Sequence, residues 1–324
     1  MFAPSRNRAG GGTKRHQRDK TEIINNTTKK RKAMKKTKRK RGDRRDGVWL
    51  RDLDALHAIV PYLYPNRADN EAFISERIDL GPIKEYLEKK NADNQGEPYK
   101  FFQVLVAAIV KTITLRPKMN RFIQGYRIYQ RNNLTMGFVV KKEFKDDAHE
   151  ALAFIPFDPD TNIDVVHRKM VDEIHSCRGE EPDNSTKGME LFKKMPRPIL
   201  RAAMWLMRKL DFYGRVPESL VKADPDYATC FITNLGSIKL RSGYHHLSNW
   251  GTTSIFVIIG EKKLRPFYDE EGNVTMKETI DLGLTIDERI ADGYYYSRTI
   301  KLLKYLLHNP ELLELPADQE VDYE

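Results

Sequence analysis

The sequence predicts a layered domain of the α/β or α+β class. From Val48 onward, segments with strand periodicity interleave with segments of helix periodicity, which is the pattern of such layers. One segment, Tyr99–Leu115, is apolar on almost every side, as a helix buried between other elements must be. The last third of the chain holds three apolar strand-like segments, which are Thr229–Asn234, Thr252–Ile259 and Thr279–Thr285.

The first elements are defined by periodicity and by proline. Ala72–Leu80 predicts a strand, because Ile74 and Ile78 fall on one face. Pro82–Lys90 predicts a short helix, and the buried helix after it ends at Arg116-Pro117, where proline disfavours a helical residue before it. Two further strands are expected around the turn at Asn132-Asn133, and they are Tyr126–Tyr129 and Leu134–Val140.

The later helices are amphipathic. Asp164–Cys177 places apolar residues at helical spacing, and a polar loop is expected over Gly179–Ser185. Met189–Tyr213 predicts two helices divided by its prolines, and a final helix over Tyr294–His308 stops at the proline that follows Asn309.

Charge divides the chain into a basic tail and a mildly acidic body. Residues 1–46 carry 18 Lys/Arg and 4 Asp/Glu, so the formal charge of +10 leaves −4 for residues 47–324. A segment this polar cannot offset its ordering entropy, and disorder is expected. A solvated tail is favoured over a nucleic-acid or targeting patch in residues 13–45, and translation from Met34 is a further alternative. The residues after Leu315 predict a short acidic tail.

Other features indicate a cytoplasmic protein. No apolar run is long enough to cross a bilayer, and no secretory signal is present. Cys177 and Cys230 lack metal or redox spacing and are expected to be reduced thiols.

The segment Asp287-Glu288-Arg289-Ile290-Ala291-Asp292-Gly293 carries the clearest functional signal. It resembles Asp-His-Arg-x-x-Asp-Gly, the catalytic signature of the acyltransferase component of 2-oxoacid dehydrogenase complexes. Chloramphenicol acetyltransferases share its shorter form, His-x-x-x-Asp-Gly. Glu288 stands where that family has its general-base histidine.

Further segments are similar to the same family, in the same order and at similar spacing. Residues 116–122 resemble its His-Pro-x-x-Asn segment, and residues 231–236 resemble its Thr-Ile-Ser-Asn-Leu-Gly strand. Residues 306–313 are similar to its terminal Glu-Asn-Pro-Glu-x-Leu sequence. The resemblance covers about Glu71 to Leu313.

The resemblance implies a two-layer domain, a mixed sheet packed against helices, as in chloramphenicol acetyltransferase. It also implies a homotrimer with active sites between subunits and coenzyme A as a substrate. In those roles Glu288 is the base, Asp292 is the aspartate of the signature, and Thr233 of a neighbouring subunit stabilises the oxyanion.

Some features depart from the family. Residues 47–315 form the expected catalytic domain, but neither a lipoyl domain nor a subunit-binding module is recognisable. Residues 186–215 look like an insertion. A stand-alone acyltransferase without a covalent lipoyl group is therefore expected, and a catalytically inactive trimeric scaffold or binding protein is the alternative.

The replaced base decides between these two hypotheses. Reference pKa values of about 8.5 for a thiol, 6.5 for histidine and 4.3 for glutamate make proton transfer to glutamate roughly 3 kcal/mol harder, about a hundredfold in rate. Burial at a dry subunit interface would raise the pKa of a glutamate and recover most of that difference. In the inactive alternative, Glu288 pairs with Arg289 or another cation, and Asp292 only caps the last helix.

Three residues are candidates for binding substrate, namely Asn234, His245 and His246. The two histidines follow Gly243-Tyr244 in a loop between strands, where one could act as a displaced base. Adjacent loop histidines are more often polar surface, and as a metal pair they lack a third ligand at a recognisable spacing.

Overall fold

The computed structural model describes residues 39–141, 150–178 and 195–323. The chain divides into two units, Met1–Asp43 and Arg44–Glu324. In the first unit only residues 39–43 are described; they form a turn in which the backbone N–H of Asp43 donates to the carbonyl of Lys40 at 3.1 Å. The expected disordered tail and the polar loop over Gly179–Ser185 lie largely outside the described residues.

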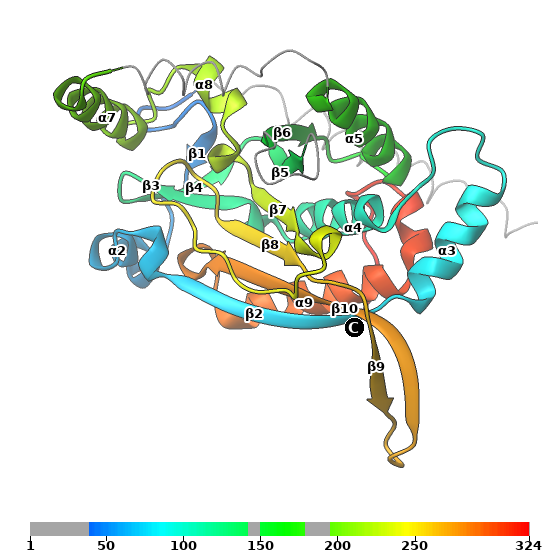
Figure 1. The fold of residues 1–324 in the computed structure, drawn as a ribbon. Coiled ribbons are helices and arrows are strands. Elements are labelled where there is room, and N and C mark those ends of the chain that lie inside the picture. Colours follow the sequence, from blue (N-terminus) through cyan, green and yellow to red (C-terminus); the bar gives the residue numbers. More distant parts are fainter. Residues whose placement is uncertain (1–38, 142–149, 179–194, 324) are drawn as a thin grey trace, which may run out of the picture. The chain divides into compact units, whose positions relative to one another are not determined.

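The second unit is built on one large mixed sheet and one small sheet (Figure 1). The large sheet has the strand order β2-β10-β8-β7-β5-β6, with β9 paired to β10 beyond this path. β7 runs parallel to both β5 and β8, and the other pairs are antiparallel. The predicted α/β class is confirmed. The strands are β1 Gly47–Trp49, β2 Glu71–Asp79, β3 Arg121–Gln124, β4 Arg127–Arg131, β5 Leu134–Lys141, β6 Glu150–Phe157, β7 Cys230–Asn234, β8 Ile255–Ile259, β9 Lys263–Tyr268 and β10 Val274–Asp287.

Helices cover one face of the large sheet. The helices are α2 Ala55–Leu63, α3 Gly81–Ala92, α4 Phe101–Leu115, α5 Ile163–Arg178, α7 Arg197–Phe212, α8 Glu218–Ala223 and α9 Gly293–His308. α4 contacts α3, α5 and α9, and every residue from Gln103 to Ile113 is buried. This all-round burial explains why α4 is apolar on every side, and the helix ends before Pro117 as expected.

The row of residues that faces these helices runs across five strands. Five buried residues pair in register from β10 to β6, and they are Ile286, Ile255, Cys230, Met136 and Ile155. The core of the unit therefore lies between this face and the helices.

The opposite face of the sheet is crossed by the loop between Lys239 and Ser254 (Figure 1). A Cβ atom on Gly283 would lie 1.9 Å from the carbonyl oxygen of Gly243, so the loop rests directly on the sheet. Tyr244 packs on Phe73 with 5.1 Å between the ring centroids. The backbone N–H of Leu247 donates to the carboxylate of Glu71.

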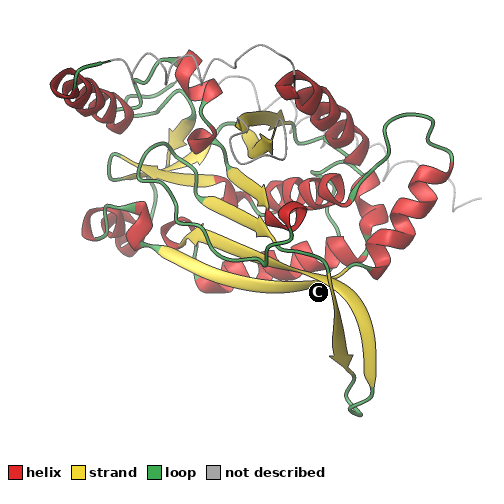
Figure 2. Cartoon of the chain, viewed as in Figure 1, coloured by secondary structure: helices red, strands yellow, loops and turns green. Residues whose placement is uncertain are grey.

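β9 and the first part of β10 form a hairpin that projects from the sheet (Figure 2). The predicted strand Thr279–Thr285 is only the middle of β10, which has 14 residues. Charged residues alternate with apolar ones over β9, and no core covers it, so apolar run length did not reveal it. β1, β3 and β6 were likewise not identified as strands, and α2 was not identified as a helix.

Two boundaries differ from those expected. Arg44 belongs to the folded unit, where its guanidinium Nε lies 2.8 Å from the Asp46 carboxylate and is buried. At the other end, Ala317 is buried, and its backbone N–H donates to Thr161 at 2.8 Å. The acidic segment packs on the domain because Ala317 and partly buried Val321 contact the core.

Candidate active site

The signature segment forms the turn between β10 and α9. β10 ends at Asp287, a short 3-10 turn spans Glu288–Ile290, and α9 begins at Gly293. The turn therefore connects the longest strand of the sheet to helix α9. Each signature side chain then has its own environment.

Asp287 and Arg289 form a buried ion pair within the signature. The Arg289 guanidinium donates to both carboxylate oxygens of Asp287, with Nε to Oδ1 at 2.8 Å and Nη2 to Oδ2 at 2.7 Å. Its remaining nitrogen donates to the carbonyl of Tyr64 at 2.7 Å. Both residues are almost fully buried, so they hold the turn in place and are not available to a substrate.

Arg67 connects this ion pair to the loop on the open face of the sheet. Its Nε lies 3.6 Å from the Asp287 carboxylate, and its other nitrogens donate to the carbonyls of Ser248 and Gly251. The side chain of Asn249 accepts from the Arg67 backbone N–H at 2.7 Å. Arg67 could not be recognised from the sequence, because these partners lie about 180 positions away in the chain.

Glu288 is the signature residue with an exposed, unpaired carboxylate. Its backbone N–H donates to Asn70 at 2.9 Å, which fixes the main chain. Within the described part of the chain, no hydrogen bond or ion pair engages the side chain, and Arg289 pairs with Asp287 instead. The expected alternative, a Glu288–Arg289 pair, is therefore wrong.

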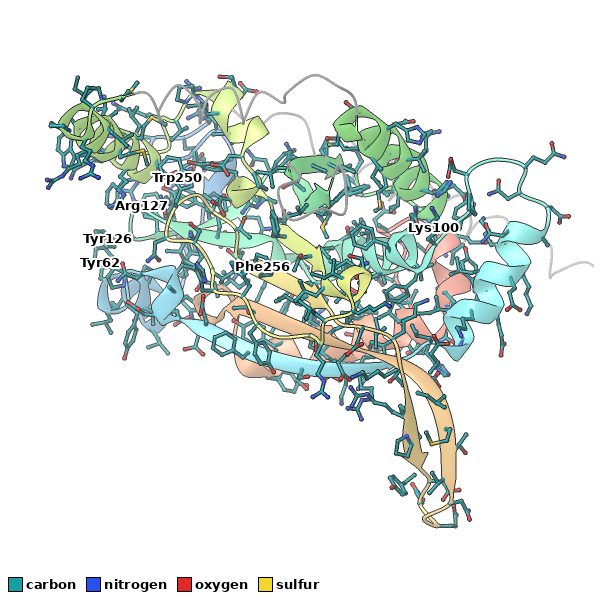
Figure 3. The ribbon with its side chains drawn as sticks, viewed as in Figure 1. Tyr62, Lys100, Tyr126, Arg127, Trp250 and Phe256 are labelled. Atoms are coloured by element: carbon teal, nitrogen blue, oxygen red, sulfur yellow. The ribbon has the colours of Figure 1, made fainter. Side chains whose placement is uncertain are left out.

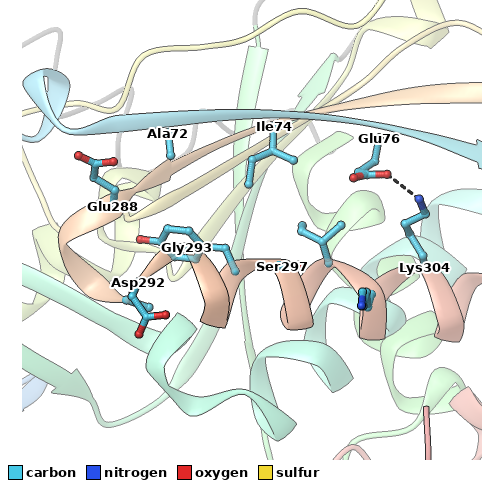
Figure 4. Close-up of a pocket in the computed structure, with 12 residues that line it drawn as sticks. Ala72, Ile74, Glu76, Glu288, Asp292, Gly293, Ser297 and Lys304 are labelled. Atoms are coloured by element: carbon cyan, nitrogen blue, oxygen red, sulfur yellow. Dashed lines mark hydrogen bonds and ion pairs between the residues drawn. The ribbon is translucent and has the colours of Figure 1, made fainter. Parts of the chain in front are cut away.

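Glu288 lines an open pocket of about 720 Å³ between β2 and α9 (Figure 4). Glu288 and Asp292 lie at one end, and an ion pair between Glu76 and Lys304 at 2.7 Å lies toward the other. The remaining wall is made of Ala72, Ile74, Ala291, Gly293, Tyr296, Ser297, Ile300 and Lys301.

Asp292 caps helix α9. Its carboxylate accepts the backbone N–H of Tyr295 at 2.9 Å, and this hydrogen bond holds the pKa of Asp292 below its usual value. The Lys118 ammonium lies 3.7 Å away. The side chain is therefore a structural N-cap that fixes the end of the turn carrying Glu288.

The structure does not bring Thr233 near Glu288 within one chain. Thr233 pairs in register with Ile258, which pairs with Gly283 on β10. Glu288 follows Gly283 by five residues, which corresponds to about 16 Å along the strand. Thr233 is half-buried, and the exposed Asn234 beside it accepts the Ser237 hydroxyl at its carbonyl, at 2.7 Å.

His245 and His246 lie on the same sheet face as Thr233. The ring of His245 stacks on Phe256 at 4.4 Å between centroids and on His246 at 4.5 Å. Phe256 contacts Phe231, which is two residues before Thr233 and so shares its face. Both histidines are exposed, and Nδ1 of His245 lies 2.7 Å from the carbonyl of His246. The predicted site residues thus form two groups, Glu288 with Asp292 and Thr233 with the histidines.

Comparison with known families gives a match over the C-terminal part of the chain. Residues 218–315 match the family described as 2-oxoacid dehydrogenases acyltransferase (catalytic domain). This segment includes β7, the histidine loop, the signature and α9, so the expected resemblance is confirmed. No curated protein matches the sequence.

Solved structures extend the likeness of fold to most of the chain. A probable dihydrolipoamide acetyltransferase from Listeria monocytogenes 4b F2365 has a TM-score of 0.53 at 13% identity, covering 79% of this chain and 89% of that one. The dihydrolipoamide acetyltransferase of Azotobacter vinelandii has a TM-score of 0.51 at 16% identity, covering 81% and 89%. At these identities the likeness establishes the fold, which is that of an acyltransferase catalytic core.

No helix in the described ranges has both the length and the apolar composition to span a membrane.

Proposed function

We propose that this chain is a stand-alone, coenzyme A-dependent acyltransferase with Glu288 as its general base. One observation carries the proposal, and it concerns the three acidic side chains of the signature. Asp287 is paired with Arg289, and Asp292 accepts a hydrogen bond as the N-cap of α9. The Glu288 carboxylate has no described partner and lines the pocket. It occupies the position at which the resembling family has its base.

The chemistry is a proton transfer followed by acyl exchange. The Glu288 carboxylate takes the proton of the coenzyme A thiol, and the thiolate sulfur attacks the acyl carbonyl carbon of the donor. The tetrahedral intermediate carries its negative charge on the former carbonyl oxygen, where the Thr233 hydroxyl donates. As the intermediate collapses, the bond to the donor heteroatom breaks and that atom takes the proton from Glu288. The same steps in reverse move an acyl group from coenzyme A to an acceptor.

The register of the sheet supports a site shared between subunits. Thr233 and Glu288 lie too far apart in one chain to act on the same carbonyl, by about 16 Å along the strand. We therefore propose a homotrimer in which Thr233 of one subunit meets Glu288 of the next. A neighbouring surface would also exclude water from Glu288, which raises the basicity of a carboxylate.

His245 and His246 are proposed to bind the substrate because they lie on the same sheet face as Thr233. Asn234 is proposed to do so because it is exposed and follows Thr233 at the end of β7. If Glu288 proves dispensable, these histidines are next in line as the base.

One observation favours the alternative, an inactive trimeric binding protein. Glu288 is exposed in the single chain, and an exposed glutamate is a weak base toward a thiol. Such a protein would use the pocket between β2 and α9 for binding without turnover.

The two functions separate in an assay of thiol release from acetyl-coenzyme A and longer acyl-coenzyme A esters with small acceptors. Glu288→Gln preserves size and removes the base, so turnover should fall roughly 10²–10⁴-fold. Glu85→Gln on exposed α3 is the matched control and should leave turnover unchanged. Measurable transfer that survives Glu288→Gln would remove Glu288 from the mechanism, and no transfer by the wild type would favour the binding protein.

A further inference from the structure

Helix α7 is amphipathic, and the described residues cover it only in part. Ile199, Ala203, Leu206 and Leu210 recur at the spacing of one helix face. Ile199 is 57% exposed and Leu206 is 52% exposed, although both belong to the apolar face. Large apolar side chains that are exposed along one helix face indicate a surface that binds a membrane or another protein.

The helix is held to the body at its C-terminal end. The buried Asp211 accepts the Tyr227 hydroxyl at 2.8 Å and the Gln124 side-chain amide, and its carbonyl accepts from Arg44 at 2.7 Å. Phe212 packs edge-on against Tyr126 at 5.3 Å. Considering the described residues alone, no side chain from Arg197 to Leu210 forms a hydrogen bond or ion pair with another element. α7 is thus anchored at its C-terminal end, and among the described residues nothing covers most of its surface.

The charge of that surface has one sign. Four cationic side chains, Arg197, Arg201, Arg208 and Lys209, are exposed along α7. The one acidic residue of the helix is Asp211, which is 2% exposed and already paired in the interior. Trp205 stands between Arg201 and Arg208 and is 63% exposed. A partner must therefore supply negative charge and accept apolar side chains together.

We propose that α7 docks the protein on a membrane surface containing anionic lipids, lying in the plane of the head groups. Basic helices with a strong apolar face and low overall hydropathy bind such interfaces without spanning them. Each Lys or Arg near an anionic leaflet gains attraction from its surface potential.

A second exposed apolar element adjoins the anchored end of α7. Tyr62 of α2 stacks on Tyr126 with 5.0 Å between centroids, and Tyr126 contacts Phe212 (Figure 3). Leu56 and Ile59 of α2 are also exposed. This aromatic chain joins α2 to α7, so the docking surface can extend beyond one helix. The proposal does not depend on acyl transfer.

The test uses the full chain with vesicles of neutral phosphatidylcholine, alone or mixed with anionic phosphatidylglycerol. The reporter is Leu206→Trp in a Trp205→Phe background, which places a tryptophan on the apolar face of α7. Its fluorescence, isolated by comparison with Trp205→Phe alone, should be quenched by lipids brominated near the glycerol end of their chains. The basic N-terminal segment has no tryptophan, so binding through that segment alone leaves this reporter unquenched. An unquenched reporter on bound protein would overturn the proposal.

Variants of α7 identify the forces. Arg201→Ala with Arg208→Ala should weaken binding to anionic vesicles about 25-fold, since each charge near the surface is worth about 1 kcal/mol, or fivefold. Leu206→Ser should weaken it by about tenfold through lost burial. Leu264→Ser and Lys262→Ala are the controls, because Leu264 is 64% exposed and both lie at the hairpin away from α7. Equal losses of vesicle binding in the control variants would refute membrane docking. So would a Leu206→Ser variant that changes the oligomer mass and leaves vesicle binding unchanged, and that result would make α7 a contact between copies of the chain.

Discussion

At the residue scale, the signature contains residues that stabilise the turn and one residue, Glu288, whose side chain is exposed and has no described partner. Asp287 and Arg289 satisfy each other in the interior, and Asp292 closes the first turn of α9. Each of these residues has a structural partner that requires its side chain. The side chain at position 288 has no described partner, so this position can carry glutamate or histidine without disturbing the turn.

Restoring the histidine tests whether position 288 holds the base. Glu288→His should fold normally, because the side chain is exposed, and should keep or raise turnover. The acid limb of the pH–rate profile should change position, because a histidine and a carboxylate at the same position release their protons at different pH. The profile of kcat/KM against pH makes the measurement. An unmoved acid limb would show that another group titrates, with the histidines of the loop as the candidates.

The capping role of Asp292 gives a stability prediction. Asp292→Ala removes the acceptor for the Tyr295 N–H and should lower the free energy of unfolding by about 1 kcal/mol, whereas Asp292→Asn should lose little. Because the hydrogen bond lowers the pKa of Asp292, its stabilisation is present above the unfolded pKa and is lost as pH falls through the folded value. Denaturant unfolding at neutral and acid pH should therefore show a smaller wild-type advantage over alanine in acid. Equal stability at neutral pH would mean the cap contributes nothing.

At the element scale, the sequence was informative where burial is continuous. β2, α4 and α9 were predicted nearly to their ends, since their apolar periodicity follows from packing on one core. The β9–β10 hairpin was not predicted. It projects from the sheet and packs no face on the core, so its sequence lacks the apolar periodicity of a buried strand. Arg67 was missed for another reason: its role depends on partners brought together only by the fold. The candidate site residues could be named from the sequence, but their separation into two groups required the sheet register.

The loop that carries the histidines depends on a glycine in β10. Gly283→Ala would place a methyl group 1.9 Å from the Gly243 carbonyl, so the loop must move. Crowding of this kind costs about 1–3 kcal/mol, measurable by denaturant unfolding. Gly243→Ala is the matched control, because a Cβ there meets nothing within 4 Å. If both variants unfold alike, the close approach of loop and sheet is not a determinant of stability; if Gly283→Ala also loses turnover, the loop belongs to the site.

At the scale of the whole molecule, the proposed active site needs two subunits, because Glu288 and Thr233 lie in two separate groups within one chain. Glu288 and Asp292 lie beyond one end of the central strands, and Thr233 with its histidines lies on the open face. With Glu288 as the proposed base, neither group alone supplies both the base and the Thr233 oxyanion donor. A cyclic homo-oligomer can join them, because each subunit then offers one group to one neighbour and the other group to the next.

Mixed oligomers provide the decisive test of that arrangement. Thr233→Val should lower turnover roughly 10²–10³-fold through the lost oxyanion donor, and Glu288→Gln lowers it through the lost base. When the two inactive variants are unfolded and refolded together in equal amounts, a neighbouring pair can combine wild-type Glu288 from one chain with wild-type Thr233 from the other. Random assembly restores such a pair at about one interface in four, so about a quarter of wild-type activity should return. Mixing without unfolding is the control and should restore nothing while subunits do not exchange. Activity of the refolded mixture that stays at the average of the two variants would place the whole site within one chain.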